Sequence, residues 1–363
     1  MNILYLFVKQ SKYKLNKVFV LCSNILNGNF LKKNYYNKLE KKMSLNNLLK
    51  DLLLRVDNEI LSRLDDTVPL LSKIGSHLIK VKGKRIRPSL TLAMSAQLNE
   101  FGENPILLAT AVEFIHTATL LHDDVVDQSN LRRGIKTANI IWGNEACVLA
   151  GDFLFAQSFD LMVETKSLQA LSVLAQASCK ITQCEFLQMQ ISNKPETNIN
   201  DYFKVIGGKT AQLFGASAQA GAIVSNGSKS QIKAAFDYGY NIGLAFQIID
   251  DVLDYVSSNK TMGKNQGDDF KLGKTTLPII LAWEKSNNKE RQFWLKTLKE
   301  LKQDENDFKN SCEILNKYAI FEQCKKVADK FINKALISLD HFSENAYKKA
   351  LFDLAKNSLS RTI

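Results

Sequence analysis

The pattern of apolar and polar positions along this chain is that of long helices. Leu, Ala and Ile recur at helical spacing over stretches of about 15 to 25 residues, with Lys and Gln between them. Runs of alternating β-branched residues between turn signals, which would predict strands, do not occur in the sequence. Five prolines and 17 glycines interrupt the 363 residues. The pattern therefore predicts an all-α protein.

Short polar segments separate the predicted helices. Residues 193–198, 226–230 and 286–289 are rich in Asn, Ser, Lys and Gly and are expected to be loops. A longer polar segment, residues 257–273, contains three glycines and is typical of a functional loop. No linker or low-complexity segment divides residues 43–363, so we expect them to form one domain.

The net charge of +11 is concentrated at the N-terminus, where residues 1–42 carry nine lysines against one glutamate. The remainder is close to neutral, so we expect no nucleic-acid partner. The apolar runs of the extension are far too short to span a bilayer. Three interpretations stay open for it: a start codon assigned upstream of Met43, an organelle-targeting segment, or a structured arm. We expect the extension to be disordered.

Six cysteines form no C-x-x-C pair, and no histidines stand at zinc spacing. A reducing compartment is the simplest interpretation. We expect the cytoplasm, with the mitochondrial matrix as the alternative if residues 1–42 are a targeting segment.

Two acidic pentapeptides lie inside apolar segments. The first, DDVVD, covers residues 123–127 and follows TLLH; the second, DDVLD, covers residues 250–254 and follows FQII. On a helix, residues i and i+4 share a face, so each motif stacks its first and last carboxylates. Like charges at that spacing repel, and burying them costs free energy unless cations neutralise them.

Hard divalent cations suit these carboxylates, because Mg²⁺ is typically held by one or two carboxylates together with substrate phosphates. One such motif alone is also typical of a solvated acidic helix end. Two copies with apolar flanks favour a metal site, and the two helices could face one another across a shared cavity.

Cationic residues alternate with the acidic motifs along the chain. Arginine forks match phosphate oxygens, so carboxylates, Mg²⁺ and arginines together could neutralise a polyphosphate from two sides. A P-loop is excluded because Phe203 stands where its first glycine should be, and His116 and His122 are too far apart for a zinc protease motif. The alternating cations are Lys84, Arg87, Arg132, Arg133, Lys209, Lys264 and Lys274.

In combination these motifs resemble the trans-polyprenyl diphosphate synthases, over essentially all of residues 43–363. The likeness is greatest to the long-chain, octaprenyl-type bacterial enzymes that make quinone side chains. Lys82 stands where the family usually has Gly, and Phe270 replaces a usual Leu; neither is a substrate-binding position. The matching segments are residues 83–88, 113–127, 132–134, 151–152, 209–210, 246–254 and 267–278.

The resemblance implies a Mg²⁺-dependent, head-to-tail condensation of isopentenyl diphosphate onto a farnesyl-type allylic diphosphate. It assigns about three Mg²⁺ ions to Asp123, Asp127, Asp250 and Asp254. The catalytic residues would be Asp123, Asp127, Asp250 and Lys209. Isopentenyl diphosphate would bind to Lys84, Arg87, His116 and Arg133, and the allylic diphosphate to Arg132, Lys209, Thr210, Gln247, Lys264 and Lys274.

The resemblance also implies a single large helical bundle around a deep central cavity, and a homodimer without a transmembrane segment. Ala118 and Thr119 precede Asp123 by five and four residues, where short-chain relatives commonly carry bulky aromatics. Their small size predicts a long product, of about eight isoprene units by resemblance, with seven to ten left open.

Two other functions would use some of the same residues. A terpene cyclase usually carries one aspartate-rich motif and needs no isopentenyl site, so residues 83–88 and the second intact motif argue against it. A non-catalytic partner subunit should have lost acidic residues from a motif, and both motifs are intact.

Overall fold

The computed structural model describes residues 44–64, 68–80, 83–132, 134–256 and 266–358. The chain divides into two compact units, Met1–Leu48 and Leu49–Ile363. The described part of the first unit is one helical turn, α3 (Leu45–Leu48), and the predicted extension, residues 1–42, lies outside the described residues.

The second unit is helical, as predicted. Its longest helices are α7 (Glu103–Val126), α9 (Asn144–Glu164), α10 (Leu168–Ile191), α13 (Lys229–Val256) and α18 (Ile320–Ser338). The others are α4 (Lys50–Arg63), α5 (Pro69–Lys80), α6 (Ile86–Gln97), α8 (Ala138–Trp142), α11 (Ile199–Ile206), α12 (Gln212–Val224), α14 (Asp268–Lys271), α15 (Leu277–Lys285), α16 (Asn288–Trp294), α17 (Asp307–Lys317) and α19 (Ala346–Ser358).

Small departures from α-helix occur at defined places. A two-residue antiparallel pair, β1 (Leu131–Arg132) and β2 (Ile135–Lys136), follows α7. The described part of the chain also contains two π-helical turns, η1 (Gly207–Ala211) and η2 (Leu295–Lys299), and one 3₁₀ turn, η3 (Leu339–His341).

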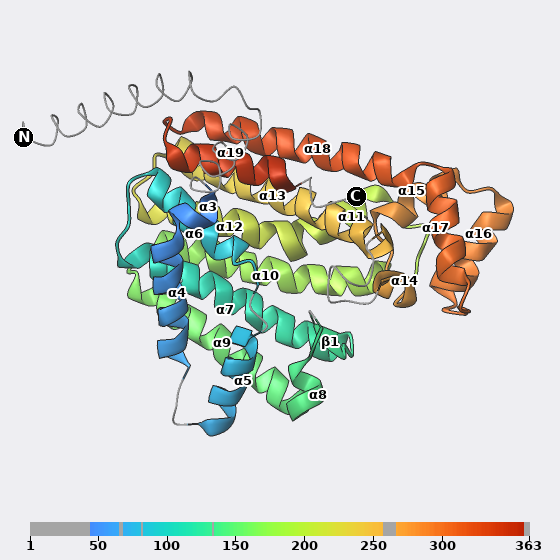
Figure 1. Ribbon diagram of the computed structural model, residues 1–363, viewed down its shortest axis with the longest axis horizontal. Helices are drawn as coiled ribbons and strands as arrows, with labels where there is room; N and C mark the ends of the chain where they lie inside the picture. The colour runs from blue at the N-terminus through green and yellow to red at the C-terminus, as the bar shows by residue number, and fades with distance from the viewer. Residues whose placement is uncertain (1–43, 65–67, 81–82, 133, 257–265, 359–363) are drawn as a thin grey trace, which may run out of the picture. The chain divides into compact units, whose positions relative to one another are not determined.

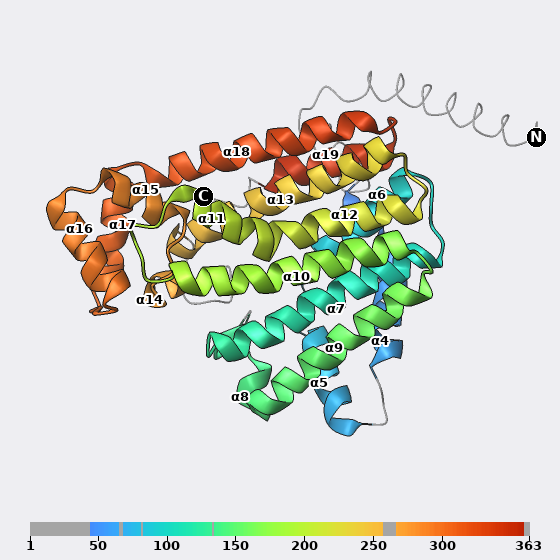
Figure 2. The same ribbon diagram turned by 180° about the vertical axis from the view of Figure 1, so that it is seen from behind.

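The bundle is organised around α12, which packs against α13, α10, α6 and α7. α9 lies along α7, and α18 covers α13 (Figures 1 and 2). Close approach requires small residues: a Cβ at Gly221 of α12 would lie 2.1 Å from the Thr91 carbonyl oxygen of α6. The composition of α12, rich in Gly and Ala, therefore explains its central place.

The helix starts follow ordinary capping chemistry. The Ser167 side chain accepts a hydrogen bond from the Ala170 amide at the start of α10, and Asn198 does the same for Asp201 at the start of α11. Such caps satisfy backbone donors that the first turn leaves open. They fix the first turns of α10 and α11, the two helices that precede η1 in the chain.

The apolar composition of α7 has a structural reason. Both α7 and α9 are long and apolar enough to cross a membrane by length and composition, but 67% of the relevant window of α7 is buried inside the protein. α7 is therefore a core helix. The corresponding share for α9 is 39%, so α9 presents apolar side chains on its outer face.

Candidate active site

Both acidic motifs lie at the C-terminal ends of long helices. Asp127 immediately follows the last residue of α7, and Asp254 lies two residues before the last residue of α13. A helix C-terminus carries a partial negative charge. The helix ends therefore add to the repulsion within each motif and favour nearby cations.

A lysine from η1 approaches the first motif. Lys209 Nζ donates a hydrogen bond to Glu185 Oε2 of α10 at 2.7 Å and lies 3.6 Å from Asp123 Oδ2. Burial raises the pKa of Asp123, and the charge of Lys209 opposes that effect. Asp123 is thus a partly buried carboxylate that depends on a neighbouring cation.

The π-helical turn η1 places this lysine. A Cβ at Gly208 would lie 2.1 Å from Cys184 Sγ, so glycine is required where η1 meets α10. π-helical turns are uncommon and recur at functional sites. Here the turn presents Lys209 and Thr210 to the ends of α7 and α13.

A second lysine links the two motifs. Lys274 Nζ donates a hydrogen bond to Asp127 Oδ2 at 3.1 Å and lies 3.9 Å from Asp269 Oδ1. The Asp269 amide in turn donates to Asp254 Oδ2 at 3.1 Å. Burial lowers the pKa of Lys274, but the carboxylates of Asp269 and Asp127 outweigh it and raise that pKa. The segment after α13 therefore connects the last aspartates of both motifs.

The middle aspartate of the first motif has a different partner. Asp124 is buried, and Arg132 of β1 donates to its carboxylate through Nη2 at 2.8 Å and through Nε at 3.1 and 3.2 Å. Asp124 thus holds Arg132 instead of sharing the face of Asp123 and Asp127.

The middle aspartate of the second motif is also turned inward. Asp251 accepts hydrogen bonds from Tyr202 Oη and Gln247 Nε2, each at 2.7 Å, and burial raises its pKa. Gln247 Oε1 accepts a hydrogen bond from Thr210 Oγ1 at 2.8 Å. The structure therefore brings together Thr210 and Gln247, which the sequence analysis assigned to one end of the site.

Two of the predicted isopentenyl diphosphate residues meet farther back along α7. Arg87 Nη1 donates to His116 Nε2 at 3.0 Å, and the guanidinium carbon of Arg87 lies 4.5 Å from the ring centre of Phe214. Burial lowers the pKa of Arg87 to about 10. Lys84 is exposed just before α6. Two other predicted residues, Arg133 and Lys264, lie outside the described residues.

Several residues of the site were not predicted from the sequence. Glu185, which binds Lys209, is 24 residues away from it with no motif to mark it. Tyr202 supports Asp251 from α11. A helical spacing of four residues could have signalled the Gln247–Asp251 contact, because both lie on α13. From the sequence, Asp268 and Asp269 could be solvated loop residues or could support the metal ligands, and the structure places Asp269 between Lys274 and Asp254.

The aspartates and lysines at the acidic motifs suit a Mg²⁺ ion that is bound together with a phosphate. Within the described residues, no group of three or more His, Cys, Asp or Glu side chains could hold a metal ion by itself. The ammonium groups of Lys209 and Lys274 supply the positive charge near Asp123 and Asp127. Mg²⁺ is commonly held by one or two carboxylates, with phosphate oxygens and waters completing its octahedron. The arrangement fits that mode and not a cage made of protein alone.

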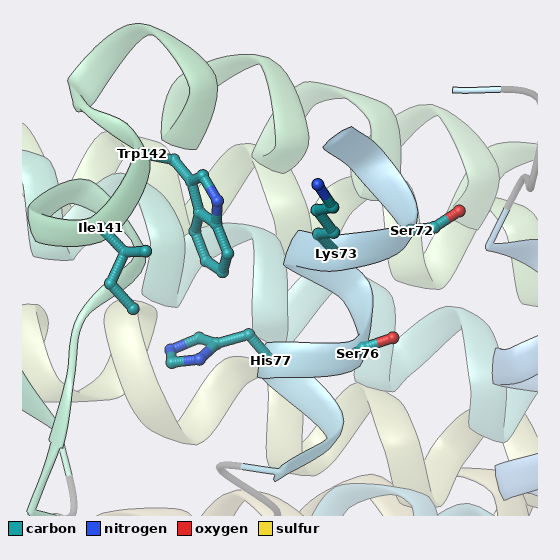
Figure 3. Close-up of a pocket in the computed structure, with 6 residues that line it drawn as sticks. All are labelled: Ser72, Lys73, Ser76, His77, Ile141 and Trp142. Carbon is teal, nitrogen blue, oxygen red and sulfur yellow. The ribbon is translucent and has the colours of Figure 1, made fainter. Parts of the chain in front are cut away.

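A separate pocket of about 420 Å³ lies between α5 and α8. Figure 3 shows the imidazole of His77 beside the indole of Trp142, and the two ring centres are 5.3 Å apart in an edge-on contact. His77 Nε2 is 3.0 Å from the Lys136 carbonyl oxygen. The described residues that line the pocket include none of the predicted site, so the pocket is distinct from the acidic motifs.

This chain is similar in sequence and in fold to known polyprenyl synthases. The polyprenyl synthetase family model matches residues 68–315. The chain is 39% identical to the octaprenyl diphosphate synthase of Haemophilus influenzae, over 85% of this chain and 93% of the relative.

Two solved structures are similar as well. A polyprenyl synthase from Caulobacter crescentus, complexed with calcium and isoprenyl diphosphate, has a TM-score of 0.85 and 41% identity, covering 88% of this chain and 97% of that one. A decaprenyl diphosphate synthase from Rhodobacter capsulatus has a TM-score of 0.84 and 38% identity, covering 88% and 98%. With these matches spanning most of its length, the chain belongs to the polyprenyl synthetase family and is a trans-polyprenyl diphosphate synthase.

Proposed function

We propose that this enzyme condenses isopentenyl diphosphate head-to-tail onto a farnesyl-type allylic diphosphate in the presence of Mg²⁺. The product would be a long all-trans polyprenyl diphosphate of about eight isoprene units, a precursor of quinone side chains. The observation that carries the proposal is that cations from other elements contact α7 at two places along its length. Lys209 and Lys274 lie at the end of α7, and Arg87 contacts His116 two turns earlier. Seven residues of helix span about 10 Å, which suits two diphosphates whose chains must meet.

The allylic diphosphate is assigned to the acidic end of α7. Asp123, Asp127, Asp250 and Asp254 would hold Mg²⁺, which as a Lewis acid stabilises the departing diphosphate. Lys209 and Lys274 contact Asp123 and Asp127 in this structure and are within reach to turn toward diphosphate oxygens. Asp124 holds Arg132 at the same end, and Lys264 is assigned there from the sequence.

Cleavage of the C–O bond between the allylic carbon and the diphosphate leaves a carbocation. Oxygen dipoles of the protein can stabilise this positive charge. Asp251 binds the amide nitrogen of Gln247 and thereby fixes its carbonyl oxygen toward the Thr210 hydroxyl. The side chains of Thr210 and Gln247 are thus held in place before the reaction, so they need not reorient when the cation forms.

Isopentenyl diphosphate is assigned to Lys84, Arg87 and His116, with Arg133 from the sequence. Arg87 is partly buried, and opposite charges attract each other more strongly in such surroundings than in bulk water. The isopentenyl double bond then attacks the allylic cation, and the released diphosphate takes the proton that leaves. No dedicated side-chain base is needed.

A long product is supported by the small residues before the first motif. Thr119 is partly exposed, and its hydroxyl donates to the His116 carbonyl at 2.8 Å. Ala118 is 1% exposed and therefore packed against protein. Thr119 is the better candidate of the two to contact the growing chain. The octaprenyl and decaprenyl products named for two relatives support a long chain.

A homodimer is part of the proposal. Leu149 and Val163 of α9 are 68% and 60% exposed, and Phe186 and Met189 of α10 are each 66% exposed. Large apolar side chains gathered on the outer faces of neighbouring helices are typical of subunit interfaces. We expect the wild type to elute as a dimer at micromolar concentration and Leu149→Asp/Phe186→Asp to elute as a monomer. A monomeric wild type would contradict the dimer.

One assay tests the reaction against its alternatives. Purified enzyme is incubated with labelled isopentenyl diphosphate, farnesyl diphosphate and Mg²⁺, and the products are separated by chain length. A ladder ending near eight units supports the proposal, whereas a hydrocarbon product would indicate a cyclase. Absence of product would indicate a non-catalytic subunit, and a ladder unaffected by EDTA would exclude the metal requirement.

A further inference from the structure

A second arginine in the segment 83–88 has no role in the proposed chemistry. Arg85 directly precedes α6, and its backbone is left-handed, with φ of 49° and ψ of 35°. A residue with a Cβ adopts this conformation at a cost in free energy, so surrounding contacts must hold it. Lys84 lies just before this turn and Arg87 two residues after it. The turn therefore sets how these two cations are presented relative to one another.

The contacts that hold the turn are carboxylates from two other helices. Arg85 Nη1 is paired with Glu113 Oε1 of α7, and Arg85 Nη2 lies 3.3 Å from Asp57 Oδ1 of α4. Glu113 is only 7% exposed, and a buried carboxylate needs a cationic partner. Arg85 thus fastens the start of α6 to both α7 and α4.

The same turn of α7 also receives Arg87. Glu113 lies three residues before His116, whose Nε2 accepts a hydrogen bond from Arg87 at 3.0 Å. Two arginines near the start of α6 therefore contact two residues on one face of α7. The charge of Glu113 also opposes the burial that lowers the pKa of Arg87 to about 10, which favours the charged guanidinium that a diphosphate requires.

We propose that Arg85 and Glu113 form a positioning pair for the isopentenyl diphosphate site. The pair does not touch substrate; it fixes the left-handed turn that presents Lys84 and Arg87 to one diphosphate. This inference rests on the proposed function, which places isopentenyl diphosphate on Lys84, Arg87 and His116. The acidic end of α7, more than one helical turn away, should be affected much less.

The test is steady-state kinetics in which each substrate is varied in turn. Arg85→Met and Glu113→Gln should raise the KM for isopentenyl diphosphate about tenfold or more, with the KM for farnesyl diphosphate and kcat within about threefold. Arg85→Lys keeps a cation beside the buried carboxylate of Glu113 and should restore the KM to within about threefold of wild type. Thermal unfolding of the same samples reports their stability.

A merely structural role predicts a different outcome. Equal changes in both KM values, a fall in kcat alone, or no rescue by Arg85→Lys would overturn the inference. If Glu113→Gln does not fold, Asp57→Asn takes its place, because it weakens the more exposed contact of Arg85. A rise in the KM for isopentenyl diphosphate without a similar rise in the KM for farnesyl diphosphate is then the decisive result.

Lys84→Ala separates this inference from the proposed function. If Lys84→Ala raises the KM for isopentenyl diphosphate but Arg85→Met does not, the positioning pair fails and the substrate site stands. If Lys84→Ala leaves that KM unchanged, the assignment of the site itself is wrong.

Discussion

The pairing of Asp124 with Arg132 gives a quantitative test of how the first acidic motif is built. Asp124 is 4% exposed and accepts three contacts from Arg132, whose side chain is 24% exposed. Asp124→Asn keeps the shape and one acceptor oxygen but removes the charge. A hydrogen bond to a charged group contributes about 1.5 to 3 kcal/mol, and partial exposure of Arg132 places the loss toward the lower end. Because about 1.4 kcal/mol corresponds to tenfold, we expect kcat/KM for the allylic substrate to fall about 10- to 100-fold.

A double-mutant cycle tests whether this loss acts through Arg132. We expect Asp124→Asn/Arg132→Gln to lie within about twofold of Arg132→Gln alone, because Asp124 then has no cation to hold. The double variant should also unfold at a higher temperature than Arg132→Gln, which leaves a buried carboxylate unpaired. If the two losses instead multiply, Asp124 acts on the reaction independently and the reasoning is refuted.

Four further predictions address the rest of the site. Asp123→Ala and Asp250→Ala should each lower kcat by about three orders of magnitude or more, since metal-borne charge stabilisation is worth several kcal/mol; a loss below about tenfold in steady-state assays would contradict the metal assignment. Gly208→Ala should lower the free energy of unfolding by about 1 to 3 kcal/mol, because its Cβ would meet Cys184 Sγ at 2.1 Å; denaturant unfolding should show part of this recovered in Gly208→Ala/Cys184→Ala, and unchanged stability would contradict the close approach. Thr119→Phe should shorten the product in chromatography of labelled chains while the first condensation continues, and an unchanged product length would place the chain elsewhere. Mg²⁺ with diphosphate should raise Tm more than Mg²⁺ alone; equal shifts would indicate a metal site made by protein.

The fold could be predicted from the sequence because its signal is local. The apolar residues of α7 and α13 recur at helical spacing, and glycine or polar clusters separate the helices. The helix repeat alone also predicts that the first and last aspartates of each motif lie on the same face of the helix. The chain therefore revealed its all-α class and the two carboxylate pairs without any tertiary information.

The partners of the middle aspartates could not be predicted in this way. Asp124 and Asp251 stand at equivalent places in the two motifs, yet one binds an arginine from β1 and the other binds a tyrosine from α11. Which groups meet them depends on how neighbouring helices pack. The same holds for Glu185, whose contact with Lys209 exists only because η1 and α10 approach closely at Gly208.

The lysines explain why acidic and basic residues alternate along this chain. Lys209 lies beside Asp123, and Lys274 lies beside Asp127, so carboxylates at the negative end of α7 already have counter-charges. A metal that binds these carboxylates would displace the ammonium groups, and each lysine would lose one carboxylate partner while Glu185 and Asp269 stay beside them. A diphosphate that arrives with the metal offers new partners, because its oxygens accept hydrogen bonds from lysine. Joint binding would then replace the lost contacts, whereas binding of metal alone would not. Two lysines on flexible stems can serve both arrangements, so their contacts with Asp123 and Asp127 lead us to expect that metal and diphosphate bind together.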